Sequence, residues 1–330
     1  MHLAPSADVD AAHTPTDHPR WRESYYFSFF DQALGIGGFS SIGKRPAKGY
    51  SGSINAVWGP EIPTYVASER GRFDEHGDEF AVAGLTYAKQ EPLGRWRLRF
   101  DGWLNDGGRA RDCDLAAVTQ TERFGGGRVR VSYDLTFTPT SPAYVYGVRP
   151  EWDGLFDGHV DEIGRMTGVV VLDGHEHEVD ARGSKDHSWG VRDWSKPTAW
   201  RWLDLLCEGG PEVALWRAKF EGPDWIQDGA SYDGATTAAL SAYREKLTTE
   251  RRDGLDRPRY YDFTVRSDTV EIQAKGDVVR VIPLVFANGD GAGGEAMWND
   301  RSLVRCVTED GRVGWAGAEF QTQTGTAGHA

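Results

Sequence analysis

Strict alternation of apolar and polar residues is the feature that most limits how this chain can fold. One face of residues 128–138 carries only apolar side chains, namely Val129, Val131, Tyr133, Leu135 and Phe137. The intervening residues are all polar, and this period of two is typical of a strand with one buried face. Residues 95–101 alternate in the same way. Helical periodicity is scarce elsewhere, so the sequence predicts a mostly antiparallel β protein.

Short strand-forming segments follow one another along the chain, and glycine-rich turns separate several of them. Further strands are expected at residues 24–30, 51–58, 79–88, 143–149, 166–172, 199–206, 212–220, 259–266, 269–274, 278–285, 302–308 and 313–320. Residues 235–250 fit either an amphipathic helix or a long strand, because helix formers alternate there with Thr and Ser. These strands are more numerous than one small barrel can hold. We therefore expect two antiparallel β-barrels or sandwiches side by side.

The proline-containing stretch 139–150 precedes a region rich in Gly and Asp and is the expected domain boundary. We therefore expect a first barrel over residues 20–150 and a second over residues 151–323. The polar, proline-containing residues 1–19 are expected to be a disordered lead-in, not a signal peptide. Residues 324–330 are expected to be a disordered tail.

Composition excludes several classes of protein. The formal net charge is −13, which disfavours nucleic acid and anionic membranes as partners. No apolar run approaches the roughly 18 residues of a membrane span. The three cysteines show no paired spacing, so we expect reduced, mostly buried thiols and a cytoplasmic location. The sequence leaves a homodimer open.

Residues 183–194 concentrate chemistry in one short segment. They combine acids, a base and aromatic residues between glycines: Asp186, His187, Trp189, Arg192, Asp193 and Trp194. Burying these charges unpaired would cost several kcal/mol each. The segment therefore indicates either a functional site beside an aromatic wall or a structural polar network that pins two strands together.

Strand geometry divides this segment between two faces. In an extended backbone Asp186 and Ser188 share one face and His187 shares the other with Trp189. Neighbouring residues then point apart, which disfavours Ser188 and His187 as a nucleophile and base. A bulge at a glycine could instead bring Asp186 and His187 together, and the sequence leaves both arrangements open.

A second candidate segment follows at residues 199–205, where Trp200, Trp202 and Asp204 share a face. A carboxylate beside two indoles would be desolvated, and its pKa would rise. The alternative is that this face points outward and Asp204 is solvated, because Leu203 and Leu205 could form the core face.

Metal binding requires several ligands to converge, and the sequence offers little sign of this. His175 and His177 share one side of a strand and would need a third ligand such as His187. However, a turn-forming Asp-Gly pair precedes them, and solvated histidines are the more common outcome. The glycine-rich stretch 35–38 lacks a following helix and Lys-Ser/Thr, so we expect only a loop there. We expect no metal and no cofactor.

The pattern Gly-x-x-Asp-His-x-Trp-Gly-x-Arg within residues 183–192 resembles the AttH-like and carotenoid 1,2-hydratase (hydroxyneurosporene synthase-like) superfamily. Residues 21–27 and 314–320 are similar to the first strand and the closing strand of that family. The resemblance implies an all-β fold of two lipocalin-like antiparallel β-barrels packed side by side. Its members include hydratases of isoprenoid double bonds and cyclases of apolar polyketides.

This resemblance implies a cofactor-independent lyase or isomerase, that is, a hydratase, dehydratase or cyclase acting on an apolar isoprenoid-, steroid- or polyketide-like substrate. A buried carboxyl kept neutral by desolvation would supply a proton, and indole faces would stabilise a carbocation. Asp186 matches the hydratase acid and His187 lies beside it. The expected catalytic residues are Asp186, His187 and Asp204. The expected substrate-binding residues are Trp189, Arg192, Trp194, Trp200 and Trp202. The alternative is a non-catalytic binding protein for a hydrophobic small molecule.

Overall fold

The computed structural model describes residues 5–76, 79–119, 124–147, 149–252, 254–287 and 296–323. The chain forms two compact units, Met1–Arg192 and Asp193–Ala330. Within the described ranges the only regular elements besides strands are short: α1 (Leu115–Thr119), η1 (Ala7–Asp10), η2 (Pro46–Lys48) and η3 (Pro150–Trp152). The predicted all-β fold is confirmed. No helix in the described part of the chain is long and apolar enough to cross a membrane.

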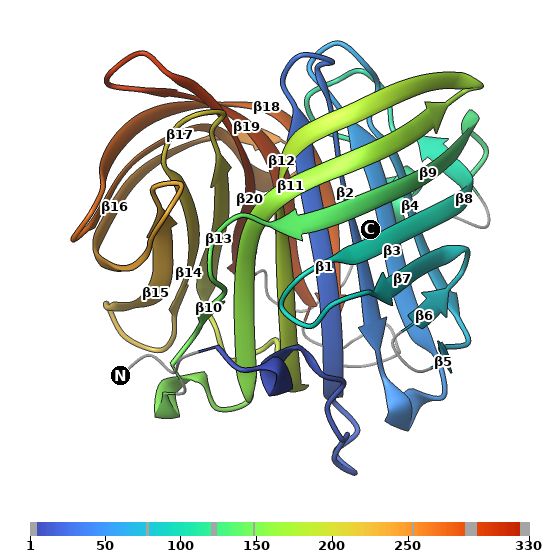
Figure 1. The fold of residues 1–330 in the computed structure, drawn as a ribbon, viewed down its shortest axis with the longest axis horizontal. Helices are drawn as coiled ribbons and strands as arrows, with labels where there is room; N and C mark the ends of the chain where they lie inside the picture. Colours follow the sequence, from blue (N-terminus) through green and yellow to red (C-terminus); the bar gives the residue numbers. More distant parts are fainter. Residues whose placement is uncertain are drawn as a thin grey trace. The chain divides into compact units, whose positions relative to one another are not determined.

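Twelve strands build the first unit (Figure 1). They are β1 (Trp21–Asp31), β2 (Ile36–Lys44), β3 (Ser51–Trp58), β4 (Tyr65–Gly71), β5 (Asp74–His76), β6 (Glu79–Val82), β7 (Leu85–Lys89), β8 (Trp96–Asp106), β9 (Arg128–Pro139), β10 (Tyr144–Val145), β11 (Gly158–Leu172) and β12 (His175–Val191). Eight of them close an antiparallel ring in the order β11-β12-β1-β2-β3-β4-β8-β9, because β9 pairs with both β8 and β11. The remaining four extend from this ring.

The second unit is a closed antiparallel barrel of eight strands in sequence order. These are β13 (Ala199–Leu206), β14 (Glu212–Lys219), β15 (Trp225–Tyr232), β16 (Thr237–Arg252), β17 (Leu255–Ser267), β18 (Glu271–Ala287), β19 (Ala296–Thr308) and β20 (Val313–Gln323). The first strand pairs with the last, Leu203 lying opposite Ala318, which closes the ring. Two antiparallel eight-stranded barrels are thus confirmed.

Alternation decides which side chains form each core. In the first unit the apolar face of β9 supplies Val131, Leu135 and Phe137 to the core, as the sequence predicts. In the second unit Leu203 and Leu205 belong to the core. The opposite face of β13 therefore carries Trp200 and Trp202, which share it by the same alternation.

The structure resolves two local expectations. Within the ambiguous segment 235–250, residues 237–250 lie in strand β16 and not in a helix. The glycine-rich stretch 35–38, expected to be a loop, enters strand β2 at Ile36. A Cβ atom on Gly37 would lie 2.7 Å from the carbonyl oxygen of Phe29, so glycine lets β1 and β2 approach. Gly37 and Gly38 therefore serve close strand pairing, whereas Gly35, with a φ of 65°, lies in the turn before β2.

The division of the chain also differs from the expectation. The boundary falls between residues 192 and 193, not at 150. Strands β11 and β12 complete the first ring, because β12 pairs along its length with β1 and β11 pairs with β9. The segment 183–192 is therefore part of the first unit and not of a C-terminal barrel.

Residues 5–19 have a defined structure, in contrast to the expected disordered lead-in. The short helix η1, drawn in dark blue in Figure 1, lies where β1 begins and β12 ends. Asp10 is fully buried there and accepts hydrogen bonds from Lys185 Nζ (2.6 Å) and the Leu93 amide (2.8 Å). Residues 1–4 and the expected disordered tail at 324–330 lie outside the described residues.

Candidate functional site

Strand β12 carries the segment that the sequence analysis singled out, and it is regularly extended. Asp186 pairs with Tyr26 on one side and Asp161 on the other, and no register shift interrupts either ladder. The alternating arrangement is therefore the one adopted. Val179 and Ala181 face the barrel core, so His187 shares the core face and Asp186 shares the opposite face.

The face opposite the core holds the outer cluster, which we define as His159, Asp161 and Asp186. The Nε2 atom of His159 contacts Asp186 Oδ2 and lies 3.2 Å from Asp161 Oδ1. The Tyr146 hydroxyl donates a hydrogen bond of 2.6 Å to Asp161 Oδ2, and its ring stacks on His159 at 4.2 Å. The Asp186 side chain is 16% exposed, whereas that of Asp161 is 2% exposed. Asp186 is thus the carboxyl of this cluster that reaches the surface.

The pKa values of the two carboxyls in the outer cluster are shifted in opposite directions. Burial acts to lower the pKa of His159, but Asp186 and Asp161 outweigh it and raise that pKa to about 10. Burial raises the pKa of Asp161. For Asp186 burial acts in the same sense, yet the His159 imidazolium and the Arg192 guanidinium prevail and lower the pKa. The exposed carboxyl is therefore ionised at neutral pH, and the expectation that desolvation keeps Asp186 neutral is not met.

A second pair of hydrogen bonds connects Asp186 to the end of the strand. The Ser188 hydroxyl donates to Asp186 Oδ1 at 3.5 Å, and Arg192 Nη2 donates to the same hydroxyl at 2.9 Å. Arg192 also donates to the Leu155 carbonyl. This buried guanidinium positions Ser188 and adds positive charge near Asp186.

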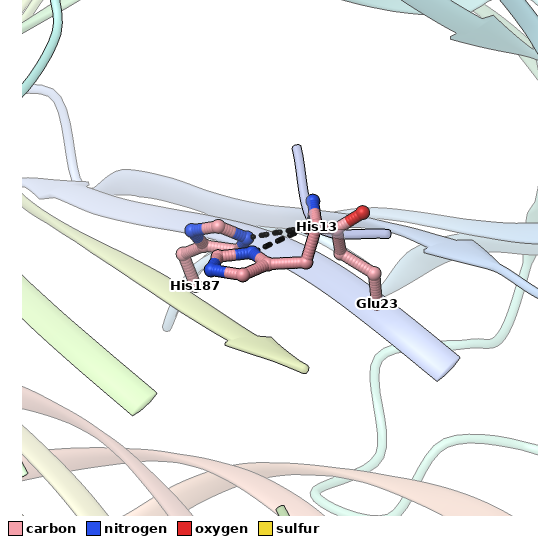
Figure 2. Close-up of side chains that lie close together, drawn as sticks. All are labelled: His13, Glu23 and His187. Carbon is pink, nitrogen blue, oxygen red and sulfur yellow. Dashed lines mark hydrogen bonds and ion pairs between the residues drawn. The ribbon is translucent and has the colours of Figure 1, made fainter. Parts of the chain in front are cut away.

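The core face holds the inner cluster, which we define as His13, Glu23 and His187 (Figure 2). His13 Nδ1 lies 3.0 Å and His187 Nε2 lies 3.2 Å from Glu23 Oε1. His187 Nδ1 lies 3.0 Å from the Val9 carbonyl oxygen. The His13 ring stacks on Trp189 at 3.5 Å. Residues before β1 therefore complete this cluster.

A proton must lie between His187 and Glu23. Both ring nitrogens of His187 face oxygen acceptors, so the geometry favours an imidazolium, although burial lowers the pKa of this histidine. Burial acts to raise the pKa of Glu23, but hydrogen bonds from His13 and His187 lower it to about 2. We therefore assign the proton to nitrogen and the negative charge to Glu23.

The neighbouring pair of core-facing charges is a buried ion triad. Lys185 Nζ donates to Asp10 Oδ1 at 2.6 Å and also contacts Glu162 Oε2, with all three side chains at most 1% exposed. Glu162 and Lys185 are direct partners across β11 and β12. The triad fastens the N-terminal segment inside the first unit.

Two groups of donor atoms in the described residues are compact enough to surround a metal ion. They are the inner cluster and the outer cluster, and neither includes His175 or His177. His175 is exposed at the start of β12, so the three-histidine arrangement considered from the sequence does not form. The hydrogen bonds within each cluster already account for the proximity of its donors.

The remaining expected residues lie in the second unit. Asp204 is fully buried and lies 3.8 Å from Arg301 Nη2, and this guanidinium lies 4.4 Å from the Trp202 ring centroid. Trp200 donates from Nε1 to Glu319 at 3.2 Å, and its ring makes an edge contact with Trp194 at 5.4 Å. Asp204 is therefore an ion-paired carboxylate beside an indole, and the solvated alternative is excluded.

The structure thus separates Asp186 and His187 onto two faces and gives each a partner set that the sequence analysis missed. The partners of Asp186 are His159 and Asp161, and those of His187 are Glu23 and His13. His159 and Asp161 lie two residues apart and share one face of β11, as Asp186 and Ser188 share one face of β12. That two-residue spacing of polar groups in an otherwise apolar strand is the signal that could have found them.

The fold of paired antiparallel barrels is shared with proteins of known structure. A "putative AttH" of Nitrosomonas europaea matches with a TM-score of 0.65 and 12% identity over 98% of each chain. Kievitone hydratase of Nectria haematococca matches with a TM-score of 0.53 and 10% identity over 92% of this chain and 89% of that one. CghA with Sch210972 matches with a TM-score of 0.57 and 12% identity over 99% of this chain and 97% of that one. The expected similarity to AttH is confirmed at the level of the fold.

These likenesses define the class of the fold, two antiparallel barrels in one chain, which this protein shares with AttH and kievitone hydratase. The family model described as "Domain of unknown function (DUF7064)" matches residues 6–324, and the chain belongs to this family. No curated protein matches the chain.

Proposed function

We propose that this protein is a cofactor-independent acid–base lyase or isomerase whose reacting group is Asp186. The observation that carries the proposal is the outer cluster, in which one partly exposed carboxylate shares a buried imidazolium with a second carboxyl. The two carboxyls repel each other when both are ionised, so one of them holds its proton more tightly than the other. Proton-transfer sites use such an arrangement to separate the pKa values of two acids.

The ionisation states favour proton abstraction as the first step. Asp186 is an ionised carboxylate with a lowered pKa, so it acts as the base. His159 holds its proton and stabilises the carboxylate before the reaction, and Asp161 with its raised pKa stays close to accept or return a proton. Dehydration, isomerisation and cyclisations that begin by deprotonation all fit this order. Hydration is the reverse, in which protonated Asp186 is a strong acid.

The substrate class we propose is an apolar isoprenoid-, steroid- or polyketide-like molecule. Kievitone hydratase, which shares the fold, is by its name a hydratase. CghA, which also shares the fold, has been solved with Sch210972. Trp189 shares the core face of β12 with His187 and not the face of Asp186. Its role in substrate binding stays a prediction, as do those of Trp194, Trp200 and Trp202 in the second unit. His187 contacts Trp189 and Asp204 pairs with Arg301, and neither residue has a role in the proposed proton transfer.

The test uses solvent deuterium as a probe of proton transfer. Purified protein is incubated in D₂O with a panel of polyketides, sterols and isoprenoids, and mass spectrometry follows deuterium uptake and the mass change of water loss or gain. Asp186→Asn should reduce the rate by at least about 10²-fold, the usual value of an acid–base group. The variant should stay folded because the change is nearly isosteric.

Asp180→Asn is the matched control, because Asp180 lies on the same face of β12 but is 70% exposed and pairs with Arg165. It should react at the wild-type rate. A panel compound that binds with no deuterium uptake would favour the alternative of a hydrophobic carrier. Wild-type turnover in Asp186→Asn would exclude this residue as the reacting group.

A further inference from the structure

The second unit contains two arginines that lie opposite each other inside a barrel. Arg201 on β13 and Arg217 on β14 are direct register partners. Arg201 lies two residues from the core residue Leu203, and Arg217 lies two residues from the core residue Leu215. Residues two apart share a face of a strand, so both arginines face the barrel interior. They are only 8% and 6% exposed, respectively. Like charges directly opposite on neighbouring strands are destabilising.

Only one of the two guanidinium groups has an acidic partner. Arg201 Nε lies 3.4 Å from Glu245 Oε1, and Glu245 also accepts a hydrogen bond of 3.0 Å from Tyr243. Arg217 has no hydrogen bond or ion pair with any residue that the structure describes, and its Nε is buried without a partner. Its guanidinium instead lies 3.9 Å from the Trp225 ring centroid and 5.1 Å from that of Tyr243.

A guanidinium group keeps its positive charge in proteins, so the two arginines cannot relieve their repulsion by becoming neutral. Two guanidinium charges and one carboxylate leave one positive charge uncompensated. An uncompensated buried charge costs several kcal/mol, whereas a bound anion would remove that cost. The charge count fits a monoanion, and the planar fork of arginine matches a carboxylate.

We propose that the interior of the second barrel binds the carboxylate of an organic acid through Arg217 and Arg201. The acid has an apolar body, because the groups around the two guanidinium ions are the rings of Trp225, Tyr243 and Phe320. The site uses no residue of the outer cluster, so it stands apart from the proposed catalytic function. It gives the second unit a ligand of its own.

Calorimetric titration with phenylacetate tests the proposal on the full chain, with its neutral counterpart phenylacetamide and with inorganic phosphate as separate probes. Phenylacetate should bind saturably, and phenylacetamide should not. Arg217→Met should weaken the binding of phenylacetate at least about tenfold, as expected for the loss of a charge-assisted hydrogen-bond pair. Arg244→Met, on the exposed face of β16, is the control and should bind as the wild type does.

Thermal melting separates a ligand site from a structural arginine. If Arg217 serves a ligand, Arg217→Met should leave the ligand-free melting temperature unchanged or higher, and phenylacetate should no longer raise it. Glu245→Gln should strengthen binding, because it removes the competing carboxylate. Equal affinity for phosphate or phenylacetamide, unchanged affinity in Arg217→Met, or no saturable binding of phenylacetate would each overturn the proposal.

Discussion

Asp161 and Asp186 are direct partners across β11 and β12, and both carboxyls meet the same nitrogen of His159. The protonated imidazole of His159 is therefore shared by both carboxyls. The difference in exposure between the acids decides their roles. Asp186 is accessible and Asp161 is not, so only the former can touch a substrate.

The first prediction concerns the pH dependence of turnover. The rate should hold down to pH 3.8 and fall only at lower pH, because the lowered pKa of Asp186 keeps this carboxylate ionised where an ordinary one would take up a proton. It should fall again as the pH passes about 10, where His159 loses the proton that stabilises the carboxylate. Deuterium uptake measured from pH 3 to 11 on folded protein checks this. A rate that declines steadily above pH 4 would mean that a neutral Asp186 is the active form.

The second prediction concerns the proton on His159. Asp161→Asn removes one of the two charges that raise the pKa of this histidine to about 10. The pKa should therefore drop towards its ordinary value of 6.5, and nuclear magnetic resonance of the labelled imidazole measures it. Asp180→Asn, an exposed change on β12, should leave the titration where it is. An unchanged pKa in Asp161→Asn would show that Asp186 alone holds the proton.

The third prediction is a pH-dependent contribution of Glu23 to stability. Its pKa is lowered to about 2 in the folded chain, from an ordinary 4.5. The contribution is therefore fully present above pH 4.5 and is lost as the pH falls towards 2, amounting to about 3 kcal/mol. Glu23→Gln should be less stable than the wild type at pH 7 and should differ little at pH 2. Denaturant unfolding at both pH values measures this, and an equal difference at both would contradict the assigned charge.

The fourth prediction concerns the N-terminal segment. Asp10→Ala leaves Lys185 with a single buried acid and should lower the free energy of unfolding by about 3 kcal/mol. Asp8→Ala changes an exposed acid in the same short helix and should cost less than about 0.5 kcal/mol. Denaturant unfolding distinguishes them. Equal effects would show that the segment is not held by the buried triad.

The sequence by itself determined the β class and the face of each strand. Period-two alternation assigns residues 128–138 correctly, because one buried face requires every second residue to be apolar. It also places Asp186 and His187 on opposite faces, once the strand is known to be regular. The pattern between Gly183 and Arg192 located the segment that carries the chemistry.

Tertiary structure alone decided the ring closure and the partners. Strands β11 and β12 belong to the first ring because of pairing with β9 and β1, which are distant in sequence. No local pattern encodes such pairing, so the domain boundary was misplaced. The same holds for the ion pairs. Asp10 and His13 look like solvated residues in a polar segment, and only the burial of Lys185 and Glu23 gives them partners. The cost of leaving a buried charge unpaired acts across the whole fold, and the sequence nearby does not record it.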